Sequence, residues 1–189
     1  MMRRLPTTGV TALTLVLLGS LPVFAQEGIN LSGNRVDPWK ASPGKAVVLV
    51  FVRTDCPISN RYAPAIQRLS AEYAGKAIFW LVYPDKDESA ATIQKHLRDY
   101  GYNLLALRDP RHTLVARSQA KVTPEAALFD SSGQLVYHGR IDNWYERFGR
   151  ARPVPTTHEL KDGLEAALAH RPPKTTETNP VGCYISDLR

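Results

Sequence analysis

The sequence has little cysteine, and it has no long hydrophobic run after its first 25 residues. It contains 2 cysteines, Cys56 and Cys183, which stand far apart in the chain. No later segment approaches the roughly 20 apolar residues that a membrane-spanning helix needs. Hydrophobic residues make up 43% of the chain and charged residues 22%, which excludes wholesale disorder and a polytopic membrane protein. Since internal repeats and low-complexity tracts are also lacking, we expect one globular domain.

The first 25 residues differ in character from the rest. Arg3 and Arg4 precede an apolar stretch over residues 10–23, and small residues follow it. This is the pattern of a signal peptide, whose apolar core is too short to span a membrane. We therefore expect residues 1–25 to be removed, and the mature protein to begin near Gln26 and to be exported to the periplasm or another extracytoplasmic compartment.

The charge balance is mildly basic and does not indicate a nucleic-acid partner. The formal charge of +6 falls to +4 without the two leading arginines, because residues 1–25 contain no Asp or Glu. This is an ordinary surface charge, and an exported domain has no obvious access to nucleic acid. Export also places the cysteines in an oxidising compartment, where a disulfide can form and persist.

After the expected cleavage site, strand-like and helix-like segments alternate. An apolar run at residues 46–52 predicts a buried strand, and a helix should follow at once, with Pro57 in its first turn. The remaining expected elements are a strand at 77–83, a helix after 89, a short strand at 104–107, a helix at 111–119, a hairpin from 126–129 and 134–141, and a helix after a capping box at 156–159. This order predicts an α/β fold with a central mixed sheet flanked by helices.

Two segments resemble the active site of the thioredoxin superfamily. Cys56-Pro-Ile-Ser-Asn-Arg-Tyr-Ala-Pro64 is similar to the family's active-site helix, in which C-x-x-C is followed five residues later by a proline. Ser59 stands where the second cysteine would be. Val122-Thr123-Pro124 is similar to the family's cis-proline segment.

The resemblance covers about residues 46–170 and is strongest to exported redoxins of the peroxiredoxin and thiol-disulfide oxidoreductase branch. It implies a thioredoxin-like domain over residues 26–170. Residues 171–189, which carry Cys183, show no periodicity and are expected to form an extended C-terminal tail.

The resemblance also implies roles for single residues. Cys56 would be the nucleophile, because a helix N-terminus favours the thiolate. Arg53 and Arg61 would support that thiolate if they lie close, whereas an inert buried cysteine is the alternative. Thr123 and Pro124 would position an extended partner through a cis peptide bond.

Because Ser59 removes the local partner, a mixed disulfide on Cys56 must be resolved by an outside thiol or by Cys183. The 13 residues from His170 to Cys183 can span about 40 Å when extended, so the tail can reach. The alternative is a purely structural disulfide between Cys56 and Cys183, worth about 4 to 5 kcal/mol in the chain-entropy model. The expected partners are protein thiols, protein disulfides or a thiol reductant, and no cofactor or metal is expected.

Two other functions stay open. A peroxiredoxin-like peroxidase would use Cys56 against a small hydroperoxide, although Arg53 stands where those enzymes usually carry Thr or Ser. A Sco-like copper chaperone would need soft ligands, such as both cysteines and His138. Asn60 occupies the position of its second cysteine, and the five histidines show no ligand spacing.

Residues 140–152 combine three aromatic side chains with four arginines. Such a composition is common at protein contacts. This segment is interpreted either as a docking surface for a partner or as a packed loop with solvated arginines.

Overall fold

The computed structural model describes residues 27–186 and residue 188. The expected signal peptide, residues 1–25, lies outside the described residues. The strands are β1 (Gly28–Asn30), β2 (Arg35–Val36), β3 (Ala46–Phe51), β4 (Ala77–Tyr83), β5 (Leu105–Arg108), β6 (Val122–Thr123), β7 (Glu125–Phe129), β8 (Leu135–Gly139), β9 (Tyr145–Arg147), β10 (Arg150–Ala151) and β11 (Cys183–Tyr184). The helices are α1 (Pro57–Glu72), α2 (Ala90–Asp99), α3 (Thr113–Ser118) and α4 (Glu159–Leu168).

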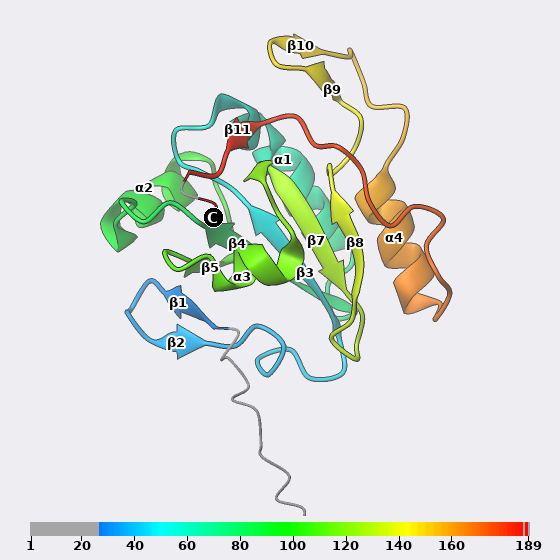
Figure 1. Cartoon of the computed structure of the whole chain (residues 1–189), viewed down its shortest axis with the longest axis horizontal. Coiled ribbons are helices and arrows are strands. Elements are labelled where there is room, and N and C mark those ends of the chain that lie inside the picture. The colour runs from blue at the N-terminus through cyan, green and yellow to red at the C-terminus, as the bar shows by residue number, and fades with distance from the viewer. Residues whose placement is uncertain (1–26, 187, 189) are drawn as a thin grey trace, which may run out of the picture.

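A seven-stranded mixed sheet forms the centre of the molecule, in the order β2-β1-β5-β4-β3-β7-β8 (Figure 1). β3, β4 and β5 are parallel, whereas β1, β7 and β8 pair antiparallel with their neighbours. Every residue of β3 is buried, as a continuous apolar run predicts for a strand that is covered on both faces. The expected α/β architecture is confirmed.

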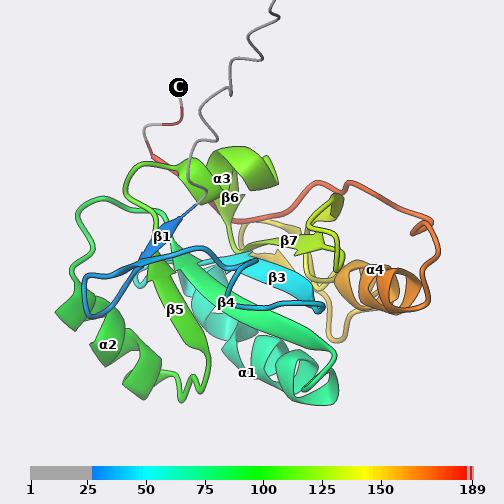
Figure 2. The same cartoon turned by 90° about the horizontal axis from the view of Figure 1, so that it is seen from below.

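The two faces of the sheet carry separate apolar clusters. α1, α2 and α4 contribute to one cluster, in which Ile66, Ile93 and Leu164 are almost completely buried. α3 covers the other face with Leu114 and Val115. Figure 2 shows α1 and α2 on one side of the sheet and α3 on the other. Among the described residues, no helix is both long enough and apolar enough to cross a membrane.

Most expected elements are present, with boundaries shifted by one or two residues, but the capping box is wrong. The N-cap residue of α4 is His158, which makes no side-chain cap hydrogen bond. The Thr157 hydroxyl instead donates to the Glu159 carboxylate at 2.7 Å. Arg140 also pairs with this carboxylate, and Glu159 is the first residue of α4, whereas a capping box needs it at the third helical position.

The short strands outside the main alternation were not predicted. β1 and β2 form a hairpin in the segment that leads to β3, and β9 and β10 form another after β8. β6 and β11 form a third two-stranded pair, which joins the C-terminal tail to the domain. Each of these strands has only two or three residues, too few to show an alternating pattern.

Candidate active site

Cys56 lies where the central strand ends and the longest helix begins. It is the N-cap residue of α1, in an extended conformation with φ −83° and ψ 109°. Its side chain is 1% exposed. Pro57 is the first residue of the helix. The sulfur thus lies at the positive end of the helix dipole, near the N–H groups of the first turn that have no partner within the helix. This placement favours a negative charge on the sulfur.

The C-terminal tail brings Cys183 onto the cis-proline segment. β11 pairs antiparallel with β6, with Cys183 opposite Thr123 and Tyr184 opposite Val122. The peptide bond between Thr123 and Pro124 is cis, as the resemblance implies. In Figure 1 the tail, coloured orange to red, runs from the end of α4 to β11 beside the start of α1. A strand of the chain itself therefore occupies the edge where a partner strand was expected.

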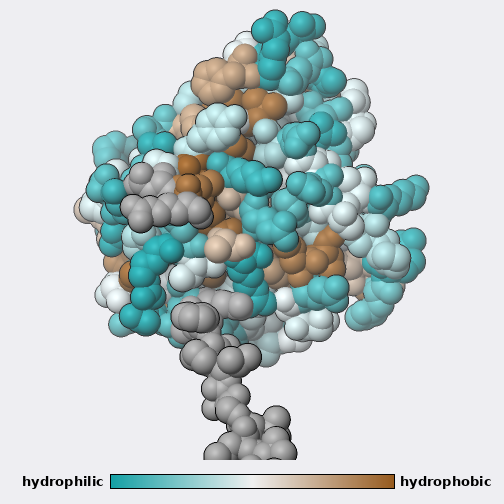
Figure 3. Space-filling view, viewed as in Figure 1, coloured by the Kyte–Doolittle hydropathy of each residue, from teal (hydrophilic) through white to brown (hydrophobic). Residues whose placement is uncertain are grey.

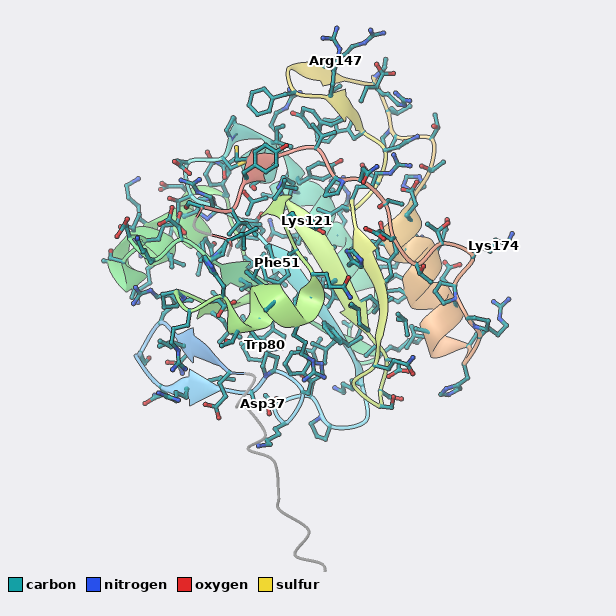
Figure 4. All side chains as sticks on the ribbon, viewed as in Figure 1. Asp37, Phe51, Trp80, Lys121, Arg147 and Lys174 are labelled. Carbon is teal, nitrogen blue, oxygen red and sulfur yellow. The ribbon has the colours of Figure 1, made fainter. Side chains whose placement is uncertain are left out.

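Residues on both sides of Cys183 hold β11 in place. A Cβ atom at Gly182 would lie 2.1 Å from the carbonyl oxygen of Thr123, so only glycine allows this approach. The backbone N–H of Ile185 donates to the Lys121 carbonyl at 3.0 Å, and its side chain is 4% exposed. Lys121 is labelled near the middle of this face in Figure 4.

The tail is attached to the domain at a second point, along β8. The hydroxyl oxygen of Thr178 accepts a hydrogen bond from the backbone N–H of Arg140 at 3.0 Å and lies 2.7 Å from the Tyr137 hydroxyl. His138 exchanges backbone hydrogen bonds with the tail, donating to Thr176 and accepting from Thr178. The tail is thus attached at two points, β6 and β8, and we call it the strap.

The two sulfurs touch without being bonded. The Sγ atoms of Cys183 and Cys56 are 2.9 Å apart, whereas a disulfide bond is about 2.05 Å long, and both thiols are free. The Cys56 Sγ also lies 3.1 Å from the carbonyl oxygen of Thr123. The expectation that the tail can reach Cys56 is confirmed across a separation of 127 positions.

The pKa values of the two thiols are shifted in opposite directions. Burial raises the pKa of Cys56, but hydrogen bonds from Cys183 and Ser59 lower it by more, so this pKa lies below its ordinary value. Burial, together with the hydrogen bond to Cys56 and the Cys56 charge, raises the pKa of Cys183 to about 12. Of the two thiols, Cys56 is therefore the one that loses its proton first, and the S–H group of Cys183 stabilises the resulting thiolate.

Ser59, which replaces the second cysteine of the motif, lies one helical turn after Cys56. It is 1% exposed, and its hydroxyl makes no hydrogen bond of ordinary geometry in the described part of the chain. A buried hydroxyl without a partner is unfavourable. Its donor is therefore available to the Cys56 thiolate, whose pKa it lowers.

A buried polar network holds the loop before Cys56, and sequence reasoning missed it. The Thr54 N–H donates to the Glu88 carboxylate at 2.7 Å, and the Asn60 side-chain amide donates to the Thr54 carbonyl at 3.0 Å. The Nε2 atom of His96 lies 2.8 Å from the side-chain amide oxygen of Asn60, and its Nδ1 atom lies 2.9 Å from the Tyr83 hydroxyl. These partners come from β4, α1, α2 and the loop before α2, so no local sequence pattern links them.

The two arginines expected to support the thiolate are engaged elsewhere. Arg53 lies 3.1 Å from both Asp55 and Asp85, and its charge lowers the pKa of Cys183. The guanidinium of Arg61 stacks over Trp144, 5.2 Å from the ring centroid. Both guanidinium groups thus have other partners, and the groups that lower the pKa of Cys56 most are Cys183 and Ser59.

His138, the histidine weighed as a copper ligand, faces two carboxylates. Its ring nitrogens lie 3.5 Å from Glu125 and 3.9 Å from Glu177. Within the described ranges, no three His, Cys, Asp or Glu side chains are grouped so that they could hold a metal ion. Cys56 and Cys183 could therefore offer a metal ion two sulfur ligands, but no His, Cys, Asp or Glu side chain among the described residues is placed as a third.

Solved structures of similar fold support the thioredoxin-like architecture. An uncharacterized conserved protein from Geobacillus kaustophilus has a TM-score of 0.72 and 23% identity, over 84% of this chain and 86% of that one. A hypothetical protein from Sinorhizobium meliloti 1021 has a TM-score of 0.71 and 22% identity, over 84% and 88%. A secreted Mycobacterium tuberculosis disulfide oxidoreductase homologous to E. coli DsbE has a TM-score of 0.51 and 21% identity, over 76% and 94%.

The sequence comparisons add the family. No curated protein matches this sequence. The pattern of the Redoxin family matches residues 18–145, which is more than half of the chain and includes the Cys56 helix and the cis-proline segment. The chain therefore belongs to the Redoxin family and has the thioredoxin-like fold.

Proposed function

We propose that this protein is a thiol-disulfide oxidoreductase in which Cys56 is the nucleophile and Cys183 the resolving thiol. The observation that carries the proposal is the contact of the two sulfurs at 2.9 Å. The opposite shifts of their pKa values support it, because they separate an attacking thiolate from a protonated partner. Family membership and the fold shared with disulfide oxidoreductases agree with this chemistry.

The first step is the attack of the Cys56 thiolate on a partner disulfide. A bond forms between Cys56 and one partner sulfur, and the other partner sulfur leaves as a thiolate that takes up a proton. The thiolate is the reactive form, so the lowered pKa of Cys56 favours this cysteine over Cys183.

The second step closes the pair. Once Cys56 is in a mixed disulfide, its charge no longer raises the pKa of Cys183. The Cys183 thiol loses its proton and attacks the Cys56 sulfur, which releases the partner as a thiol and forms the Cys56–Cys183 disulfide. The partner gains two electrons and this protein loses two. A thiol reductant then restores both thiols: one reductant thiolate attacks the Cys183 sulfur and Cys56 leaves as a thiolate, and a second reductant thiol releases Cys183 as the reductant becomes a disulfide.

The strap controls which sulfur a partner meets. Cys56 is 1% exposed, whereas Cys183 is half-buried. A protein disulfide can reach Cys56 only after β11 leaves β6, and a reductant can attack the outer sulfur, Cys183, while the strap is closed. Opening of the strap is therefore part of the reduction of a bulky partner, and closing brings the resolving thiol back.

The direct test is the trapping of intermediates. Reduced wild-type protein, Cys56→Ser and Cys183→Ser are mixed with a peptide disulfide, quenched with acid and examined by mass spectrometry. The proposal expects an intramolecular disulfide in wild type and a lasting mixed disulfide in Cys183→Ser. Unchanged reactivity in Cys56→Ser would overturn it. Consumption of hydrogen peroxide in parallel reactions tests the peroxidase alternative.

A structural disulfide is the second candidate, favoured by the burial of Cys56 beneath β11. In that case the bond is a staple that is not exchanged in each cycle. Cys183→Ser would then lower the stability of the oxidised protein by about 4 to 5 kcal/mol. The staple candidate expects no mixed disulfide at Cys56 when the reduced protein meets the peptide disulfide.

We also propose that the protein is exported. The support is the signal-peptide pattern in residues 1–25. Expression of the full chain followed by cell fractionation and N-terminal sequencing tests the proposal. A mature N-terminus near Gln26 in the extracytoplasmic fraction is expected, and an uncleaved chain in the cytoplasm would overturn it.

A further inference from the structure

A basic arm projects from the domain at the end where the two cysteines lie. It comprises residues 144–152, with β9 and β10 joined by a turn at Phe148 and Gly149. Gly149 has a φ of +76°, a conformation suited to glycine. The arm stands away from the sheet in Figure 1, and Arg147 points outward from its tip in Figure 4. We call this segment the arm.

The base of the arm is fixed to the active-site helix. The Tyr62 hydroxyl donates to Asp142 at 2.6 Å, and the same carboxylate oxygen accepts from the Trp144 N–H at 2.9 Å. The indole N–H of Trp144 donates to the Arg152 carbonyl at 2.9 Å, and its ring packs against Tyr62 and beneath Arg61. The arm is thus pre-organised, so less conformational entropy would be lost when a partner binds to it.

The charge of the arm is positive and only partly compensated. It carries three arginines and one glutamate, which gives a formal charge of +2. Arg150 pairs with Glu146 at 2.6 Å, and Arg152 pairs with the same carboxylate. Arg147 forms no ion pair with any residue that the structure describes. A partner with acidic side chains would complement this charge.

Exposed apolar side chains lie on the arm, shortly after it in the chain, and on β11. Phe148 is 63% exposed, Val154 is 66% exposed, and Tyr184 of β11 is 81% exposed. Figure 3 shows hydrophobic surface at this end of the molecule, bordered by hydrophilic residues. Aromatic and arginine side chains together are the ones that most often contribute binding energy at protein interfaces.

We propose that the arm forms the docking surface for an acidic protein partner that exchanges its disulfide or thiols with this protein. The inference rests on the proposed thiol-disulfide function. The base of the arm is fixed to α1 six residues after Cys56. A partner held by the arm therefore has its sulfur near the Cys56 end of α1 when β11 opens. Its acidic residues meet Arg147, and an apolar side chain meets Phe148.

The test uses three peptides of equal length, each with one cysteine in a mixed disulfide with thionitrobenzoate. The cysteine is flanked by one leucine and by Glu, Ser or Lys residues. Release of thionitrobenzoate by the reduced protein is followed by absorbance. At low salt the Glu peptide is expected to react about tenfold faster than the Lys peptide, and salt should reduce this ratio because exposed charges are screened.

Two variants locate the effect on the surface. Arg147→Glu combined with Phe148→Ser should abolish or reverse the preference for the Glu peptide. Lys76→Glu is the matched control, since Lys76 is exposed beyond the far end of α1 and changes the net charge in the same way as Arg147→Glu. The control should keep the preference. Equal loss in both variants would overturn the inference, because it would then reflect net charge alone.

A small neutral probe separates this inference from the proposed function. Hydroxyethyl disulfide has no charge to steer, so wild type and the arm variant should reduce it at equal rates. If this probe reacts but the three peptides react at equal rates, docking by the arm is overturned and the oxidoreductase function stands. If neither the probe nor any peptide oxidises the cysteine pair, both proposals are overturned.

Discussion

The two cysteines lie in regions that are built in opposite ways. Cys56 stands at the junction of a fully buried strand and a 16-residue helix, inside the larger apolar cluster. Cys183 stands in a two-residue strand on a tail that is held by backbone hydrogen bonds, the hydroxyl of Thr178, the buried side chain of Ile185 and close approaches at two glycines. One region is rigid because it is packed, and the other stays in place through a few local contacts.

This difference assigns separate tasks to the two sulfurs. The packed region fixes the position of Cys56 and, through the helix N-terminus and its hydrogen-bond donors, lowers its pKa. Of the described tail residues only Ile185 is buried in the core, and segments with few buried apolar contacts open at low free-energy cost, so the tail can leave and return. The following predictions test this comparison, from the largest expected effect to the smallest.

Loss of the packed cysteine should have the largest effect. Cys56→Ser is expected to reduce thiol-disulfide exchange by at least a hundredfold, since no thiolate is left at the helix N-terminus and burial still raises the pKa of the remaining thiol, Cys183. Cys183→Ser should retain the first attack and lose resolution. Rates of disulfide reduction by stopped-flow absorbance, with both variants under identical conditions, check this. Equal rates for the two variants would contradict the division of tasks.

A methyl group at Gly182 should release the tail while leaving the core intact. The added Cβ would lie 2.1 Å from the Thr123 carbonyl oxygen, and Gly182 has no left-handed φ that would strain alanine. Gly182→Ala is therefore expected to separate β11 from β6, slow intramolecular disulfide formation about tenfold or more, and speed alkylation of Cys56. Thr175→Ala, at an exposed position in the same tail, is the control and should behave as wild type.

The network before Cys56 should contribute stability that depends on pH. Glu88→Ala removes the acceptor of the Thr54 N–H and should cost about 1 to 3 kcal/mol, measured by urea unfolding. Burial raises the pKa of Glu88 above its ordinary 4.5. The folded state then holds this proton more tightly than the unfolded state, so stability falls as pH rises through the raised pKa.

Glu88→Gln separates the hydrogen bond from the charge. Its side-chain oxygen can still accept from Thr54, but it cannot ionise. The difference in melting temperature between this variant and wild type should therefore grow in favour of Gln as the pH rises from below 4.5 to neutral. A constant difference across that range would show that Glu88 has the same protonation in both states.

The smallest effect concerns the hydroxyl of Ser59. Ser59→Ala removes a donor that lowers the pKa of Cys56, so the thiolate fraction at a pH below that pKa should fall. A hydrogen bond of about 0.5 to 1.5 kcal/mol corresponds to an alkylation rate slower by about two- to tenfold. Iodoacetamide kinetics against pH, in the Cys183→Ser background, measure this directly. Ser59→Thr is the control that keeps the hydroxyl.

Some of these features could be predicted from the sequence and others could not. The strand at 77–83 and the helix that begins after Cys56 were readable, because their apolar spacing is dictated by the core that they cover. β11 and the arm were not readable as strands, since two or three residues carry no periodicity. Gly182 beside Cys183 is a local signal of a close backbone approach, but a glycine alone does not say which segment approaches it.

The sequence by itself determined the mixed α/β sheet, the position of Cys56 at a helix N-terminus, and the absence of a second cysteine at Ser59. These follow from local spacing, which fixes which faces are apolar and where a helix can start. Only the tertiary structure decided that Cys183 lies on the cis-proline segment, that Arg61 stacks on the arm, and that Glu88 holds the loop before Cys56. Such contacts join residues 34 to 127 positions apart, and their geometry depends on the packing of the whole sheet.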